Sequence, residues 1–224
     1  MGESRVYRLL AGLDRLKWRL IYKGLLAGAV AGALVAVYRY GIEWGTERAV
    51  QIYAAMGKNL WLLLPWAAGL ALASWILYRL MKLEPYAKGS GIPQVEGMVL
   101  FGLKIRWYTV LAVRFGAGLV SSLFGVSLGR EGPSIQLGAA GAQAIAKRTC
   151  GSKLEENCLI TAGASAGLAS AFNAPLSGIL FSLEEVHRTF SPNILAAATS
   201  AALTADLISK FIFEIGRASC RERV

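Results

Sequence analysis

Three stretches of this chain contain no charged residue. They run from Leu60 to Tyr78, from Asn157 to Leu183 and from Thr189 to Ala205. A helix of roughly 20 apolar residues is long enough to cross a bilayer. These stretches recur along the chain, whereas a signal peptide stands only at the start. Only 17% of the 224 residues are charged, against about 25% in soluble domains. The sequence therefore predicts an all-α, multi-pass integral membrane protein.

The net charge of +10 includes a basic cluster just before the first apolar segment. Its members are Arg5, Arg8, Arg15, Lys17, Arg19 and Lys23. Basic residues beside apolar segments favour the cytoplasmic side, so we expect a cytoplasmic N-terminus and an interfacial helix over residues 1–23. The compact N-terminus favours a plasma-membrane location. No nucleic-acid-binding motif accompanies the charge, so membrane lipid is an expected partner and nucleic acid is not.

The rest of the chain is expected to form one transmembrane part over residues 24–213. Its first span, over about 24–45, is rich in Gly and Ala, which permit close helix packing. A loop near 43–58 is expected to lead to a second span over 60–80. Residues 214–224 break the pattern and resemble one translation frame of a sequencing-library adapter, so we expect a non-native tail. A genuine cytoplasmic tail is the alternative.

Two Gly-x-x-x-Pro segments interrupt the apolar pattern, Gly89-Ser-Gly-Ile-Pro93 and Gly129-Arg-Glu-Gly-Pro133. Proline is favoured at the first helical position, and glycine lets backbone N–H groups approach a ligand closely. Each segment therefore predicts a helix N-terminus, whose free N–H groups and partial positive charge attract anions. Broken helices of this kind form the midplane binding sites of membrane transporters. The candidate anion-binding residues are Gly89, Ser90, Gly91, Ile92, Arg130 and Gly132.

Three glutamates beside these breaks are candidates for proton chemistry. Glu131 lies inside the second break, where its carboxylate competes with an anion for the same donors and leaves when protonated. The alternative is an acid that only complements the helix dipole, but a charge at membrane depth costs roughly 2.5–3.5 kcal/mol, which favours function. Glu184 and Glu185 end a long apolar segment. Their spacing fits either a proton acceptor reached from the cytoplasm or a solvated helix end paired with Arg188.

The other polar residues do not indicate an enzyme. The three cysteines lack metal-ligand spacing, and there is no His-Glu-x-x-His motif or Ser/His pairing. We therefore expect no catalytic residue, metal or cofactor. Glu96 and Arg114 are expected to form an internal ion pair.

Three motifs together resemble the CLC family of chloride channels and transporters. They are the two Gly-x-x-x-Pro segments and Phe172-Asn-Ala-Pro-Leu-Ser-Gly-Ile-Leu-Phe181, which is followed by Glu184-Glu185. The resemblance implies the first half of an inverted-repeat fold with broken, tilted helices, in a protein that is a homodimer at full length. It implies that the Ser90 hydroxyl coordinates chloride, that Glu131 is the gating glutamate and that Glu185 transfers protons.

The implied function is chloride transport, with protons as the exchanged ion in the full-length parent. Retention of acids at both Glu131 and Glu185 favours a chloride/proton antiporter. Two alternatives stay open: a passive chloride channel of the same family, and a non-transporting membrane fragment that needs a second half.

Overall fold

The computed structural model describes residues 3–57, 60–126, 129–188 and 190–221, with side chains described for 17–57, 61–126, 129–188 and 190–213. Within these ranges the ordered elements are helices and there is no strand. The elements are α1 (Glu3–Met56), the 3₁₀ turn η1 (Leu60–Leu62), α2 (Leu63–Leu83), the 3₁₀ turn η2 (Pro85–Ala87), α3 (Ile92–Leu100), α4 (Trp107–Leu123), α5 (Glu131–Thr149), α6 (Lys153–Phe172), α7 (Pro175–Phe181), the π-helical turn η3 (Ser182–His187) and α8 (Pro192–Arg221). The all-α prediction is confirmed.

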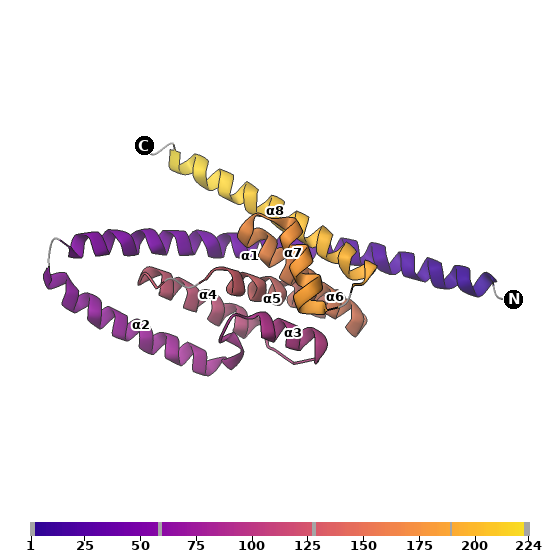
Figure 1. Ribbon diagram of the computed structural model, residues 1–224, viewed down its shortest axis with the longest axis horizontal. Coiled ribbons are helices and arrows are strands. Elements are labelled where there is room, and N and C mark those ends of the chain that lie inside the picture. The colour runs from indigo at the N-terminus through magenta and orange to yellow at the C-terminus, as the bar shows by residue number, and fades with distance from the viewer. Residues whose placement is uncertain (1–2, 58–59, 127–128, 189, 222–224) are drawn as a thin grey trace.

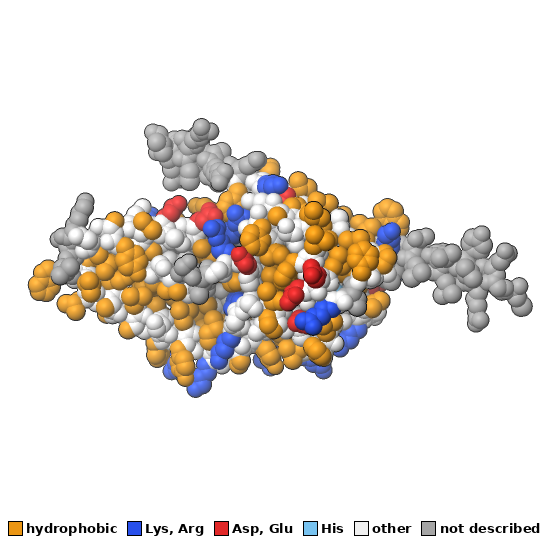
Figure 2. All heavy atoms as spheres, in the orientation of Figure 1, with side chains coloured by type: hydrophobic (Ala, Val, Ile, Leu, Met, Phe, Trp, Pro, Cys, Tyr) orange, Lys and Arg blue, Asp and Glu red, His pale blue; other side chains and the backbone are white. Residues whose placement is uncertain are grey.

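Among the described residues, three helices are long and apolar enough to cross a membrane: Lys17–Met56 within α1, Leu63–Leu83 and Pro192–Phe213 within α8. Helix α2, all of whose residues are described, buries only Ala73. Large apolar side chains such as Trp61 and Trp75 are exposed on or next to this helix, and hydrophobic side chains are spread over it in Figure 2. Lipid is the solvent that suits such a surface.

Small residues let the long helices pack closely. Helices α1 and α8 run in the same direction and cross (Figure 1), with Gly28 against the backbone of Ala201 and Gly32 against that of Ala205. A Cβ on Gly32 would lie 2.7 Å from the Ala205 Cα, a distance that real Cβ atoms do not show. The Gly and Ala content of the first span therefore serves helix contact, as predicted.

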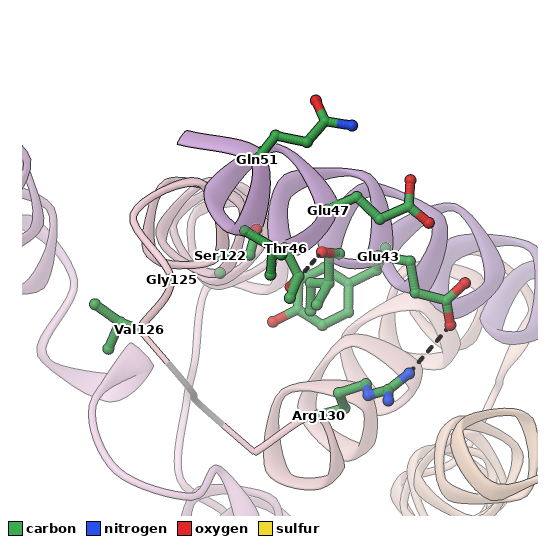
Figure 3. A pocket seen from close by; sticks show the side chains of 12 residues that line it. Glu43, Thr46, Glu47, Gln51, Ser122, Gly125, Val126 and Arg130 are labelled. Carbon is green, nitrogen blue, oxygen red and sulfur yellow. Dashed lines mark hydrogen bonds and ion pairs between the residues drawn. The ribbon is translucent and has the colours of Figure 1, made fainter. Parts of the chain in front are cut away.

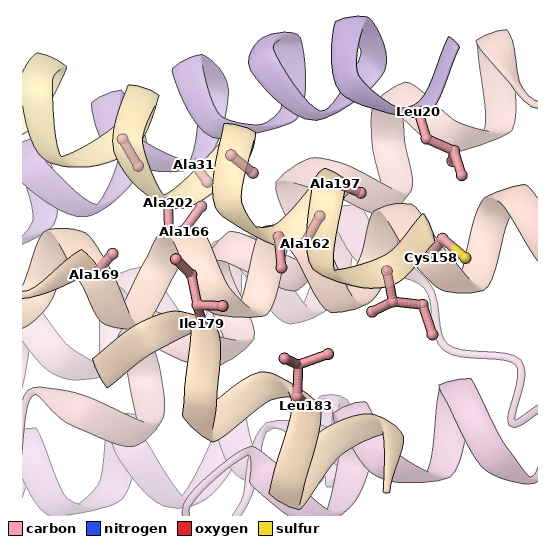
Figure 4. Packing of buried hydrophobic residues seen from close by; sticks show 14 residues of the cluster. Leu20, Ala31, Cys158, Ala162, Ala166, Ala169, Ile179, Leu183, Ala197 and Ala202 are labelled. Atoms are coloured by element: carbon pink, nitrogen blue, oxygen red, sulfur yellow. The ribbon is translucent and has the colours of Figure 1, made fainter. Parts of the chain in front are cut away.

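Helix α6 lies at the centre of the bundle. Every residue from 158 to 170 is buried, between α5 on one side and α1 and α8 on the other. Figure 4 shows small side chains of three helices meeting in one core, including Ala31 of α1, Ala166 of α6 and Ala202 of α8. Because alanine adds little bulk, these backbones come close and leave little room for a larger side chain.

Two features of α1 differ from the sequence-based expectation. The loop predicted near 43–58 is wrong, since the helix continues to Met56. Gly41 and Gly45 do not end it, because they face Leu119 and Ser122 of α4 and continue the packing stripe of small residues. The helix also passes the predicted boundary at residue 23 without a break. The division between an interfacial and a transmembrane part stays a prediction.

The C-terminal tail is only partly described. The backbone of α8 passes residue 213 and continues as helix to Arg221. The side chains of 214–221 and residues 222–224 lie outside the described part, so the origin of 214–224 stays a prediction.

Candidate functional site

Both Gly-x-x-x-Pro segments end in a helix N-terminus, as predicted. Helix α3 begins at Ile92, after Gly91 in the left-handed conformation with φ 89°, a conformation that glycine adopts freely. Helix α5 begins at Glu131, with Arg130 as its N-cap. Each helix starts before its proline, which is the second residue of α3 and the third of α5. A proline there still costs little, because the N–H groups of the first turn have no partner within the helix.

The two helix N-termini are in direct contact. A Cβ on Gly132 would overlap the carbonyl oxygen of Ser90 and lie 2.8 Å from its carbonyl carbon. A Cβ on Gly91 would lie 3.0 Å from the Gly132 oxygen and 2.9 Å from the Gln136 Cβ. Ser90, Gly91 and Gly132, predicted from two separate motifs, therefore meet at one point. Two positive helix ends that share one point attract an anion more strongly than either end alone, so this contact is the candidate anion site.

Two buried polar side chains hold the segment that precedes α3. Arg114 of α4 donates to the carbonyl oxygens of Ala87 and Gly89, at 2.5 Å each. Gln136 of α5 donates from Nε2 to the Tyr86 oxygen at 2.7 Å. These bonds satisfy carbonyl oxygens in η2 and in the loop that follows it. They also tie the first break to α4 and α5. Sequence reasoning missed Gln136, since a glutamine one turn into a helix carries no motif.

The predicted ion pair between Glu96 and Arg114 is wrong. Arg114 binds backbone carbonyls, and Glu96 pairs at 2.8 Å with Arg188, which comes from beyond η3. The signal in the sequence was a charged residue in an apolar helix, and that signal does not say which partner the fold supplies.

Glu131 is the first residue of α5 and its side chain is exposed at the site. Arg130, one residue earlier, turns toward α1 and pairs with Glu43 at 3.1 Å. The pair borders a hollow of about 690 Å³ between α1, α4 and α5. Figure 3 shows the Arg130–Glu43 pair across this hollow and Glu47 on the next turn of α1. Arg130, the residue before Glu131, therefore borders an open space that both apolar and polar side chains line.

Glu184 and Glu185 lie in η3, which packs against α3. Val186, the next residue, is buried in the same cluster as Val95 and Met98 of α3. Both glutamates are exposed. This exposure fits the solvated helix end, but Arg188, the partner expected for it, pairs with Glu96. The roles of both acids stay predictions. The two acids thus lie on an element that packs against α3, the helix whose N-terminus is part of the predicted anion site.

The third motif forms the turn between α6 and α7. Asn173 ends α6 in the left-handed conformation with φ 53°. Arg39 of α1 donates to the Ser170 carbonyl oxygen at 2.6 Å and to Asn173 Oδ1 at 3.1 Å. A cation at a helix C-terminus satisfies free carbonyls and complements the dipole, so this break is stabilised from α1.

Comparison with known proteins places the chain in a family. Residues 69–219 match the sequence family described as voltage gated chloride channel. The H(+)/Cl(-) exchange transporter ClcA of Salmonella arizonae is 32% identical over 220 residues, which are 96% of this chain and 46% of that protein. The ClcA of Cronobacter sakazakii is 33% identical over 95% of this chain and 46% of its own length.

Solved structures agree with this placement. A slow cyanobacterial Cl⁻/H⁺ antiporter has a TM-score of 0.76 at 28% identity, over 87% of this chain and 47% of that one. A CLC-type fluoride/proton antiporter has a TM-score of 0.65 at 26% identity, over 86% of this chain and 46% of that one. The chain thus spans about half the length of the relatives it matches. It belongs to the voltage-gated chloride channel (CLC) family.

Proposed function

We propose that this chain supplies the N-terminal half of a chloride/proton antiporter. The observation that carries the proposal is the contact of the α3 and α5 N-termini at Ser90 and Gly132, with Glu131 on the first turn of α5. The relatives named as proton/chloride exchangers and antiporters support the choice of ions. The second half of such a protein would complete the pathway.

Chloride binding follows from the donors at this point. The free N–H groups of the first turns of α3 and α5, together with the Ser90 hydroxyl, are donors that suit a monovalent anion. Both dipoles point their positive ends at the same place, which lowers the cost of holding a charge at membrane depth. Gly132 lets the two helix N-termini meet, because a side chain there would overlap the Ser90 carbonyl.

Proton coupling follows from Glu131. When ionised, its carboxylate binds the same N–H groups as chloride and excludes the anion. When protonated, it loses its charge, leaves the donors and lets chloride enter. Protonation of Glu131 is therefore linked to anion movement at the same point. Glu185, with Glu184 next to it, would pass protons between the cytoplasm and this point, from a position along α3.

The placement in the cell is part of the same proposal. The basic residues ahead of the first span favour a cytoplasmic N-terminus, and we propose a homodimer in the plasma membrane, surrounded by lipid. A passive chloride channel is the second candidate, and it differs in having no proton movement linked to chloride.

The test uses the longer protein to which we assign this segment, reconstituted in liposomes with chloride efflux and external pH recorded together. Antiport predicts chloride efflux accompanied by proton uptake. Glu131→Ala should abolish proton coupling while chloride still flows. Glu47→Ala is the control, because Glu47 is an exposed acid one turn after Glu43 on α1, and it should leave coupling intact. Chloride efflux without proton movement in the unmodified protein would make it a channel.

The internal acid is tested by a pair of neighbouring variants. Glu185→Gln should stop proton movement with chloride transport retained, and Glu184→Gln should have a smaller effect. If Glu184→Gln alone stops the protons, the acceptor is Glu184. If neither does, the proton path lies elsewhere and the assignment of η3 is refuted.

A further inference from the structure

A second hollow, of about 270 Å³, lies away from the anion site, where the loop after α3 meets the end of α5 and the start of α6. Three lysines from three elements line it: Lys104 from the loop, Lys147 from the last turn of α5 and Lys153 from the first turn of α6. Convergence of basic side chains from separate elements builds a site for an anion.

The charge of this hollow is not neutralised by the described part of the chain. Within that part none of the three lysines forms an ion pair, and each is exposed. Glu156 also lines the hollow, so the lining carries three positive charges and one negative charge. The Lys153 ammonium reaches over the loop, since its Nζ would lie 3.6 Å from a Cβ on Gly102.

A buried amide lines the same hollow. Gln143 is 5% exposed, and its Oε1 has no hydrogen-bond partner among the described residues. The oxygen and nitrogen of a side-chain amide exchange places by a simple rotation, so Gln143 can turn N–H donors toward a bound oxyanion. Asn157 is fixed differently, because its Nδ2 already donates to the Val99 oxygen at 2.9 Å. Gln143 is thus a buried amide whose oxygen lacks a donor, and it contributes to anion binding only through its Nε2 group.

The hollow lies at the basic end of the molecule. Lys23 near the start of the first span pairs with Glu155 of α6 at 2.7 Å and lies 3.8 Å from the Cys150 sulfur, in the turn between α5 and α6. This turn and the hollow beside it therefore share an end with the basic N-terminal part of α1. Anionic head groups gather against such an end, and basic pockets between membrane helices bind phosphorylated head groups.

We propose that this hollow binds a phosphate oxyanion, carried by the head group of an anionic phospholipid in the leaflet next to the basic end of α1. Lys104, Lys147 and Lys153 pair with the phosphate oxygens, and Gln143 donates to one of them. The volume is below the roughly 300–1,000 Å³ of sites for drug-sized ligands, which suits a single phosphate group. Soluble phosphate has the same chemistry and is distinguished from lipid by experiment.

The test titrates the purified chain in detergent with short-chain phosphatidic acid and counts bound lipid by native mass spectrometry. The unmodified chain should bind one lipid in a saturable manner. The triple variant Lys104→Gln/Lys147→Gln/Lys153→Gln should bind about 100-fold more weakly, since each lysine contributes about fivefold near an anionic phosphate. Glu156→Gln, which removes the opposing charge, should bind more tightly.

The matched control removes the same charge outside the hollow, in Lys17→Gln/Arg79→Gln/Lys82→Gln, and should bind as the unmodified chain does. Equal losses in the two triple variants would show a general charge effect and overturn the proposal, as would no loss in either. The triple Lys→Arg variant of the hollow keeps the charge and should retain binding. If the triple Lys→Gln variant does not fold, the comparison is made between the triple Lys→Arg variant and the three single Lys→Gln variants.

Inorganic phosphate separates the two sources. If millimolar phosphate displaces the lipid from the unmodified chain, the site takes the oxyanion from either source. If the lipid stays bound, the acyl chains contribute and the source is the phospholipid. If neither phosphate nor phosphatidic acid binds in a lysine-dependent manner, the proposal is refuted.

Discussion

The contact between the two broken helices makes a sharp prediction for Gly132→Ala. The added Cβ would overlap the Ser90 carbonyl oxygen and lie 3.0 Å from the Ser90 Cα. These are backbone atoms, and hydrogen bonds from Arg114 and Gln136 to neighbouring carbonyls hold their segment in place. The overlap therefore cannot be relieved by rotating a side chain, and the helix ends must separate.

The size of the effect follows from two opposing contributions. Insertion of a methyl group into a packed contact costs about 1–3 kcal/mol, and a clash with pinned backbone belongs near the upper end. Alanine gains at most about 1 kcal/mol over glycine in a helix. The expected net loss is about 2 kcal/mol, which corresponds to a fall of about 4–8 °C in Tm for a chain of this size.

The assay is thermal unfolding of the chain purified in detergent. Gly129→Ala is the matched control, because it belongs to the same motif, has no atom within 4 Å of its added Cβ and does not have a positive φ. Its Tm should stay within about 2 °C of the unmodified chain, as for a substitution without contacts. If Gly132→Ala leaves Tm unchanged, or if both variants lower it equally, the two helix N-termini are not in contact and the anion site is not formed in this way.

Two further substitutions test the scaffold by the same Tm measurement. Gly28→Leu places a side chain against the Ala201 backbone and should force α1 from α8, at a cost of about 3 kcal/mol or more, whereas Gly116→Leu, with nothing within 4 Å of its Cβ, should have little effect; equal losses would contradict the crossing. Arg114→Leu leaves two carbonyl acceptors, one of them on Gly89, without their donor and should lower stability by about 2–6 kcal/mol; an unchanged Tm would show that water replaces the guanidinium.

Local chemistry made the helix breaks predictable. Glycine and proline act on the backbone within a few residues, so the N-termini of α3 and α5 and the turn at Asn173 could be placed to within two residues. Runs of uncharged residues identified the spans of α2 and α8 for the same reason, because burial in lipid depends on composition along a single helix.

Helix continuity and side-chain pairing could not be predicted in this way. Polar residues near Glu43 suggested a loop, but contacts of Gly41 and Gly45 with α4 keep α1 helical to Met56. Arg114 was correctly recognised as unusual, yet its partners depend on how α4 is rotated against the segment before α3. Tertiary packing decides such cases, because it brings together groups that no sequence spacing relates.

By itself, the sequence determined that the chain is an α-helical membrane protein with two glycine-rich helix starts and an acid in the second. Those properties depend on residue type and near neighbours alone. Only the tertiary structure decided that Ser90 and Gly132 touch, and that Lys104, Lys147 and Lys153 line one hollow. The physical reason is that an anion site needs several donors around one point, and the register of packed helices, which many distant contacts fix together, sets where that point lies.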